Sequence, residues 1–231
     1  MKKLSVGLGF LVLAFLFGTI PAVFAEEGQK DPWTGPYVGL TVGMGEGEVQ
    51  ETPDFERNQA QLDGSIFGVL VGYDYRIGDS KIISGIAGSI GKGNISGSRT
   101  EDLCPGCVVS NIDTTETRIE WLNTLYVRLG YDMGDFLPYL LGGIVIGEAE
   151  TSVRNVRRLG GSVDTAGSWT KQAFVGGMLG FGLDYRITEE ITIGARFARV
   201  EFDLLETANN SSFRGIGLSG NIAQAEIKLS F

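Results

Sequence analysis

The residue types that could support catalysis are few in this chain. Its 231 residues include no histidine and only two cysteines. A serine nucleophile needs a neighbouring base to take its proton near neutral pH, and histidine is the most common one. Lys228 or Glu226 could replace it in principle, but no serine beside them has the context of an activated nucleophile. Ser230, the nearest serine, is better explained as a side chain that only fills space. The sequence therefore predicts a protein that is not an enzyme and carries no cofactor.

Cys104 and Cys107 form the motif CPGC, in which Pro105 and Gly106 suit a tight bend. Such a pair is oxidised outside the reducing cytoplasm, so a disulfide is the leading prediction. A redox-active C-x-x-C would need a thioredoxin-like βαβ context, which the sequence lacks. A zinc site would need further Cys or His ligands nearby.

A further set of charged residues alternates with apolar residues along the chain. If the alternating segments are strands, these charges leave the face opposite the aliphatic residues. Charges buried together must pair or become neutral. If the strands enclose a lumen, we therefore predict an ion-pair network that plugs it, with Arg128 and Glu226 among its members. The alternative is that the charges line a gated, narrow conduit. The full set is Asp74, Arg76, Arg128, Asp184, Arg186, Arg196, Glu226 and Lys228.

Three related stretches mark the elements that would position these charges. VGYDYRIGD (71–79), LGYDMGD (129–135) and FGLDYRITE (181–189) each end an alternating segment and open a short polar turn. The C-terminal EIKLSF fits as a fourth copy without a turn, so the repeating unit is a pair of strands. The eight predicted strands are 36–46, 65–76, 81–91, 119–132, 138–148, 171–186, 191–204 and 219–231.

The predicted connections alternate in length. Those near 77–80, 133–137 and 187–190 are tight, whereas those near 47–64, 92–118, 149–170 and 205–218 are long. This asymmetry is typical of a membrane barrel with short periplasmic turns and long extracellular loops. Backbone groups in lipid have no water to bond, so the strands must close on one another. We therefore predict an all-β fold, a closed eight-stranded antiparallel transmembrane β-barrel.

Aromatic residues gather at the tight-turn ends of the even-numbered strands, where a periplasmic aromatic belt would lie. A soluble, lipocalin-like barrel with its apolar face inside would explain the alternation, but not the belt, the turn asymmetry or the terminal aromatic residue. The predicted belt consists of Tyr73, Tyr75, Tyr131, Tyr185 and Phe231.

The strand 191–204 fits the outward pattern poorly. Its outward set continues past Phe197 to Arg199 and Glu201. Either a bulge near Ala198 flips the register, or both charges stand above the bilayer.

The N-terminus reads as a targeting segment. A basic start, an apolar run over 4–20 and small residues at Val23 and Ala25 predict a signal peptide, residues 1–25, cleaved before Glu26. The alternative is a membrane anchor helix. Residues 26–231 then form the outer-membrane β-barrel. The net charge of −9 disfavours nucleic acid as a partner.

The segment WTGPYVGLTVG (33–43) resembles the opening of the small outer-membrane β-barrel family typified by OmpA and the Omp25/Omp31-type surface proteins. WLNTLYVRLGY (121–131), LPYLLGGIVIG (137–147) and the C-terminal Phe231 are also similar to that family. The resemblance covers 33–231 and implies location in the outer membrane of a Gram-negative bacterium. Its motifs are structural, so they support the fold more than any activity.

The resemblance and the residues together predict a structural or surface-interaction role. The expected partners are outer-membrane lipid, the barrel-insertion machinery through the C-terminal strand, and an extracellular ligand. Arg154, Arg157 and Arg158 could contact lipopolysaccharide phosphates, although such a run is more often a solvated face. The alternatives are a low-conductance porin-like channel and a haem- or host-ligand-binding surface protein, in which only Tyr or Met could ligate haem iron.

Overall fold

The computed structural model describes residues 31–50, 60–102, 110–159, 162–203 and 217–231. The barrel belongs to the compact unit Pro32–Phe231. Its strands are β1 (Gly35–Gln50), β2 (Ala60–Arg76), β3 (Ile82–Asp102), β4 (Ser110–Tyr131), β5 (Phe136–Leu159), β6 (Ser162–Arg186), β7 (Ile191–Asp203) and β8 (Gly217–Ser230). No helix in these ranges is long and apolar enough to cross a membrane.

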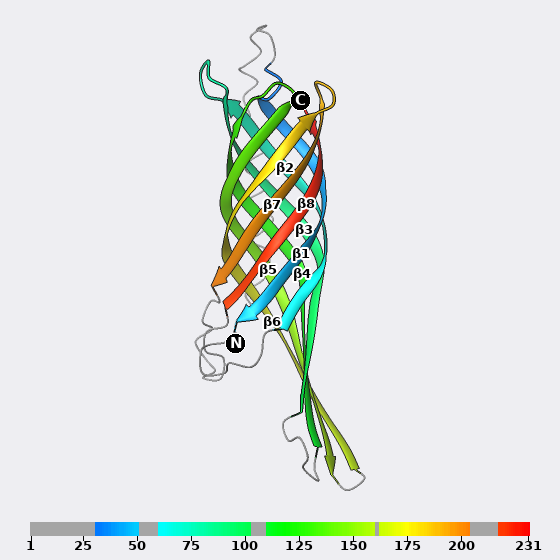
Figure 1. Cartoon of the computed structure of the whole chain (residues 1–231). Coiled ribbons are helices and arrows are strands. Elements are labelled where there is room, and N and C mark those ends of the chain that lie inside the picture. The colour runs from blue at the N-terminus through cyan, green and yellow to red at the C-terminus, as the bar shows by residue number, and fades with distance from the viewer. Residues whose placement is uncertain (1–30, 51–59, 103–109, 160–161, 204–216) are drawn as a thin grey trace, which may run out of the picture. The chain divides into compact units, whose positions relative to one another are not determined.

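Each strand pairs antiparallel with the next, and β8 pairs with β1, so the sheet closes on itself (Figure 1). The prediction of a closed, eight-stranded antiparallel barrel is confirmed. The predicted signal peptide, residues 1–25, and both Cys104 and Cys107 lie outside the described residues, so those predictions stay predictions.

The stagger of the strands sets the width of the barrel. We start at Tyr37 on β1 and move to its paired residue on β2, then to that residue's partner on β3, and so on around the cylinder. The path returns to β1 at Gly47, ten positions beyond Tyr37. Eight strands with this stagger give a tilt of about 41° and a backbone radius of about 8 Å, for strands about 4.8 Å apart and a rise of about 3.3 Å per residue. A cylinder this narrow is filled by its own side chains.

The two faces of the sheet differ as the alternation requires. On β1, Val38, Leu40, Val42 and Met44 are exposed on the outside, whereas Tyr37 and Thr41 are buried inside. The same alternation holds on β6, where Leu179, Phe181 and Leu183 face outward. The outer surface is therefore apolar, and the core of the protein is the lumen.

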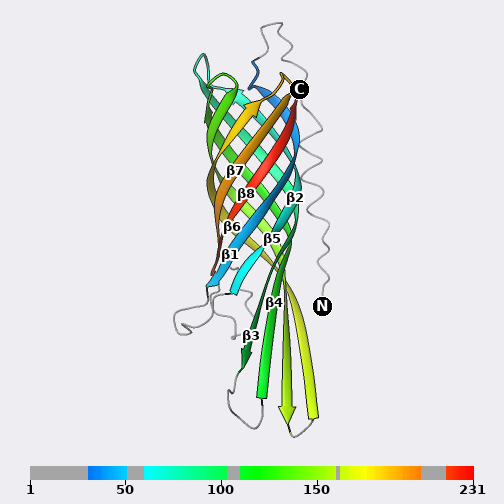
Figure 2. The ribbon, with the colours of Figure 1, turned by 45° about the vertical axis from the view of Figure 1, so that its right-hand side comes forward.

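The structure differs most from the prediction at the open end of the barrel. Much of the predicted long loops 92–118 and 149–170 is strand, because β3 continues to Asp102, β4 begins at Ser110, and β5 and β6 meet across 160–161. Figures 1 and 2 show β3–β6 running past the ends of the other strands. We call the outer parts of these strands (97–102, 110–117, 151–159 and 162–170) the protruding sheet. The loop prediction was wrong here because a sheet that meets water on both faces needs no apolar alternation.

The register of β7 is also settled. Its pairing with β6 and β8 runs without a shift from one end to the other, so the bulge near Ala198 is absent. Arg199 and Glu201 both face outward, and the Arg199 Nε lies 3.3 Å from a Glu201 oxygen. Register shifts occur instead in β3, between Lys92 and Ile95, and in β4, between Ile119 and Trp121.

Candidate functional site: the charged layer of the lumen

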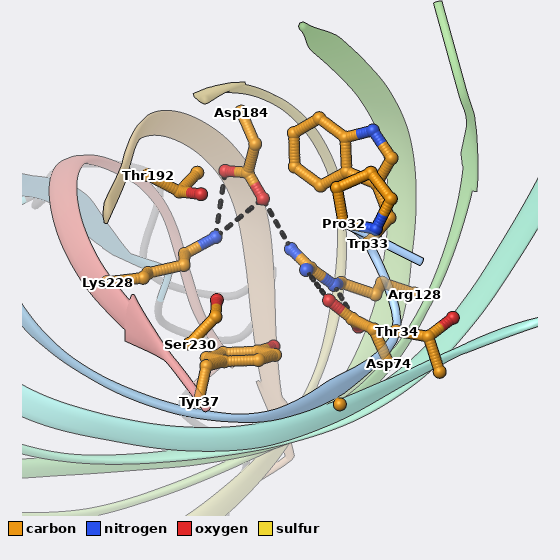
Figure 3. Close-up of a pocket in the computed structure, with 11 residues that line it drawn as sticks. Pro32, Trp33, Thr34, Tyr37, Asp74, Arg128, Asp184, Thr192, Lys228 and Ser230 are labelled. Carbon is orange, nitrogen blue, oxygen red and sulfur yellow. Dashed lines mark hydrogen bonds and ion pairs between the residues drawn. The ribbon is translucent and has the colours of Figure 1, made fainter. Parts of the chain in front are cut away.

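The tight-turn half of the lumen holds a chain of ionised side chains from four strands (Figure 3). Arg128 donates two hydrogen bonds to Asp74, the one from Nε measuring 2.8 Å. Its Nη1 donates to Asp184 at 2.8 Å. Lys228 donates to both oxygens of Asp184 at 2.8 and 2.7 Å. Asp184 is completely buried, and the other three are nearly so.

Glu226 and Arg196 extend this chain toward the open end. The Glu226 carboxylate lies 3.0 Å from both Arg196 Nε and Lys228 Nζ. These contacts are ionic only, because neither has the geometry of a hydrogen bond. Arg196 donates instead to the Tyr126 hydroxyl at 2.6 Å and to Gln224 at 2.9 and 2.7 Å. The charged layer is therefore made of three carboxylates (Asp74, Asp184, Glu226) and three cations (Arg128, Arg196, Lys228), which balance.

Two tyrosine rings, those of Tyr37 and Tyr139, lie beside two of the cations, Arg128 and Lys228. The Arg128 guanidinium lies 5.1 Å from the ring centroid of Tyr37 and 4.9 Å from that of Tyr139. The Lys228 ammonium lies 5.6 Å from each. These are cation–π contacts, which strengthen when water is excluded. The rings fit because a glycine lies beneath each: a Cβ on Gly182 would meet the Tyr139 ring at 2.3 Å, and one on Gly72 would meet Tyr37 at 2.4 Å.

The layer repeats itself across the barrel. Tyr37 on β1 and Tyr139 on β5 occupy matching positions, as do Asp74 on β2 and Asp184 on β6. Arg128 on β4 likewise corresponds to Lys228 on β8, since both precede a leucine near the end of their strands. Every pair is four strands apart, half of the cylinder. The two halves of the barrel thus supply the same set of a tyrosine, an aspartate and a cation.

The tight-turn mouth of the lumen is covered by Trp33. This side chain is buried against Ile83 and Leu137, and its indole nitrogen donates to the Gly134 carbonyl at 3.0 Å. The Arg186 guanidinium lies 5.3 Å from the Trp33 ring. A cavity with about 310 Å³ of empty space, part of it open to solvent, lies between Trp33 and the charged layer. The mouth is therefore narrow but polar.

Two predicted network members lie at this mouth rather than in the layer. Arg76 pairs with Asp132 at 2.7 Å, and Arg186 pairs with Asp135 at 3.0 Å. Both are at the ends of their strands, where the wall opens to solvent. The other six residues of the predicted set, Asp74, Arg128, Asp184, Arg196, Glu226 and Lys228, are the buried charged layer itself.

The open-end half of the lumen is apolar, which the sequence analysis did not predict. Along β2 the inward residues are Leu62, Ile66 and Leu70 before Asp74. Phe174 and Phe202 meet edge to face, with centroids 4.6 Å apart. The alternation of inward and outward residues along each strand would have revealed these residues, because they lie between the outward-facing ones. The buried apolar set comprises Leu62, Ile66, Leu70, Ile95, Ile119, Leu122, Val145, Phe174, Met178, Val200, Phe202 and Ile222.

The predicted belt residues and Arg154 lie on the outer surface. The five belt residues Tyr73, Tyr75, Tyr131, Tyr185 and Phe231 are all exposed, by 39 to 59 %. Arg154 is exposed on the protruding sheet, whereas the side chains of Arg157 and Arg158 lie outside the described part of the chain. Within the described ranges, no group of three or more His, Cys, Asp or Glu residues could hold a metal ion.

Comparison with known proteins decides what kind of barrel this is. Residues 10–231 match the family described as outer membrane protein beta-barrel domain. The chain belongs to this family. It is therefore a protein of the outer membrane of a Gram-negative bacterium, and its apolar outer face is the surface that meets lipid.

A curated relative is similar over most of its length. The 31 kDa outer-membrane immunogenic protein of Brucella melitensis biotype 1 is 26% identical over 177 residues, which cover 71% of this chain and 69% of the relative. This agrees with the resemblance to Omp25/Omp31-type proteins.

Solved outer-membrane barrels are similar at lower identity. Neisserial surface protein A is 14% identical, with a TM-score of 0.41, over 86% of this chain and 98% of that one. The outer membrane protease OmpT from Escherichia coli is 12% identical, with a TM-score of 0.34, over 89% and 99%. Neither likeness bears on activity.

Proposed function

We propose that this outer-membrane barrel is a closed, non-catalytic anchor with a structural and surface-interaction role, which holds the protruding sheet outside the cell. The observation that carries the proposal is the balanced charged layer, in which Asp184 joins Arg128 and Lys228 across the lumen. Tight turns face the periplasm in barrels of this type, so the protruding sheet at the opposite end is extracellular.

The dimensions and the tiers of the lumen support closure. A backbone radius of about 8 Å leaves no continuous path once inward side chains project from all sides. A solute would have to break the charged layer and then part the apolar residues near Leu62, Leu122 and Phe174, which are almost fully buried. Hydrated ions do not enter an apolar constriction of this kind without a large desolvation penalty.

The absence of catalysis is part of the proposal. The chain contains no histidine, so a serine nucleophile would lack its usual base. The contacts of Lys228 and Glu226 with Asp184 and Arg196 occupy the groups that could replace it. We also propose two partners for this chain: lipopolysaccharide, which would contact the exposed Arg154, and the barrel-insertion machinery, which would bind β8.

Conductance in planar bilayers tests the proposal against the channel alternative. We expect no stepwise current from the wild type, and none from the R128A variant, because the apolar half of the lumen stays closed. A known porin in the same bilayers is the positive control. Defined single-channel steps from the wild type, or steps that appear on loss of Arg128, would show that the charges gate a conduit instead.

A further inference from the structure

Within the described residues, β6 has a long free edge, which runs along the protruding sheet and ends in the barrel wall at Phe174. We propose that residues 162–174 form a docking site for an extended basic and apolar segment of a partner protein, which would add a strand to this sheet. The inference deepens the surface-interaction role proposed above and rests on it, because the sheet must be extracellular to meet such a partner.

The pairing of β6 defines the edge. With β5, β6 pairs along its whole outer part, starting at Leu159↔Ser162. With β7, it pairs only from Val175↔Asp203 inward. Within the described residues, 162–174 therefore have a neighbouring strand on one side only. At a rise of about 3.3 Å per residue, the free edge is about 43 Å long.

The hydrogen bonds at the tight-turn end of β6 show which of its residues direct their N–H and C=O groups toward β5 and which toward the other side. The Arg186 amide donates toward β5, to Asp135, and the amide of the next residue, Ile187, donates toward β7, to Ile191. The β5–β6 register has no shift, so this alternation continues outward. The odd-numbered residues of the edge, including Thr165, Gly167, Trp169 and Lys171, thus direct their N–H and C=O groups to the open side. These groups can bind an incoming strand.

The edge lacks two of the features that normally protect exposed strands, and its two charged residues, Asp164 and Lys171, are seven positions apart. It has no proline and no register shift. The opposite edge of the sheet, 97–102 of β3, is shorter, follows a register shift and contains Arg99, Glu101 and Asp102. Charges, bulges and short length are the usual means of blocking edge pairing. Among the described residues, one edge of the sheet is therefore protected and the other is available for strand addition.

The side chains beside the edge define the chemistry of the partner. The Lys171 ammonium lies 3.3 to 3.6 Å from oxygens of Glu120, Glu148 and Glu150, a cluster with a net charge of −2. Trp169 is 70 % exposed on the same face, two residues away. An antiparallel segment would place a Lys or Arg opposite Lys171, where the attraction of three carboxylates outweighs the repulsion of one ammonium, and then an apolar residue opposite Trp169. The matching pattern is basic-x-apolar.

Two other occupants are conceivable, and the experiment separates them. The connection 204–216 leaves the barrel at Asp203 and returns at Gly217. A chain of this length that runs out and back can pair with at most about six residues, half of the edge. A second copy of the chain could use the edge in the same way as a foreign strand.

The test uses the full chain in lipid nanodiscs and a fluorescein-labelled peptide, RTITVT, whose first, third and fifth residues face Lys171, Trp169 and Gly167 in antiparallel register. Binding is followed by anisotropy. A proline at Gly167 removes a donor on the open side and leaves the β5 pairing intact, since edge positions tolerate proline when the N–H faces solvent. We expect G167P to weaken binding by about tenfold or more, and the charge-reversed peptide ETITVT to bind about fivefold more weakly.

The matched control is T100P, which places proline on the free side of the β3 edge and should change affinity by less than about twofold. W169A leaves the backbone unchanged and should weaken binding by about threefold to fivefold. Heat-dependent gel mobility shows that each variant keeps its barrel. Hydrogen exchange should slow at Thr165, Gly167 and Trp169 when the peptide binds.

Several results would overturn the inference. One is the lack of saturable binding, and another is an equal loss of affinity in T100P. A third is protection of the edge amides without peptide, which would mean that the connection 204–216 (if independent of concentration) or a second copy (if dependent on it) fills the edge. None of these results depends on conductance, so the closed-anchor proposal stands or fails separately.

Discussion

The D184N variant removes one charge from the charged layer and keeps the shape of the side chain. Asp184 is fully buried and accepts hydrogen bonds from both Arg128 and Lys228. Its loss leaves two carboxylates against three cations in a medium that solvates charge poorly. Breaking a buried ion pair by removing one partner typically destabilises a protein by about 3–5 kcal/mol, and D184N belongs in this range.

The partner variant K228M leaves the opposite imbalance, three carboxylates against two cations, and should destabilise by a similar amount, about 3–5 kcal/mol. The double variant D184N/K228M restores neutrality, because Asp74 keeps Arg128 and Glu226 keeps Arg196. We expect the double variant to lose no more than about 2 kcal/mol, where additive effects would give about 6–10 kcal/mol.

Equilibrium unfolding by guanidinium in lipid vesicles, followed by tryptophan fluorescence, measures these free energies. Heat-dependent gel mobility shows whether each variant has formed its barrel. The reasoning would be refuted if the double variant lost the sum of the two single losses, because the two charges would then act independently. It would also be refuted if D184N alone were as stable as the wild type.

Three further predictions concern the packing around the charged layer. G182A should destabilise by about 1–3 kcal/mol, because its Cβ would meet the Tyr139 ring at 2.3 Å, whereas the control G177A, with no atom within 4 Å of its Cβ, should change stability little by guanidinium unfolding. Y139F should be neutral or slightly stabilising in the same assay, since the buried Tyr139 hydroxyl has no hydrogen-bond partner among the described residues. W33A should lose about 3–5 kcal/mol without producing current in planar bilayers, because the charged and apolar tiers above Trp33 remain; a current in W33A would mean that Trp33 is the only seal.

The number of strands and the position of the tight turns were predictable from the sequence. Each follows from a period of two in hydrophobicity, which depends only on neighbouring residues and on which face meets lipid. The same signal failed on 97–102 and 110–117, where β3 and β4 leave the membrane and both faces meet water. The strands form there because their backbones hydrogen-bond to neighbouring strands, and the pattern of residues along one strand does not predict that pairing.

The charged layer shows a second limit. The alternation along the strands placed Asp74, Arg128 and Asp184 on the inner face of the barrel. It did not predict which of these charges would pair with which. The tyrosines that enclose Arg128 and the indole of Trp33 at the mouth were also absent from the predicted network. These contacts join residues far apart in the chain, so they depend on how far each strand is shifted against the next.

The amino-acid order by itself determined that this chain alternates apolar and polar faces and turns tightly after every second strand. Those properties are local, and together they require a closed barrel in lipid. Only the tertiary structure decided that Asp184 lies between Arg128 and Lys228, that the outer half of the lumen is apolar, and that β6 keeps a free edge. The physical reason is closure: a stagger of ten residues around eight strands brings side chains from opposite walls to one level, and no pattern along a single strand contains that number.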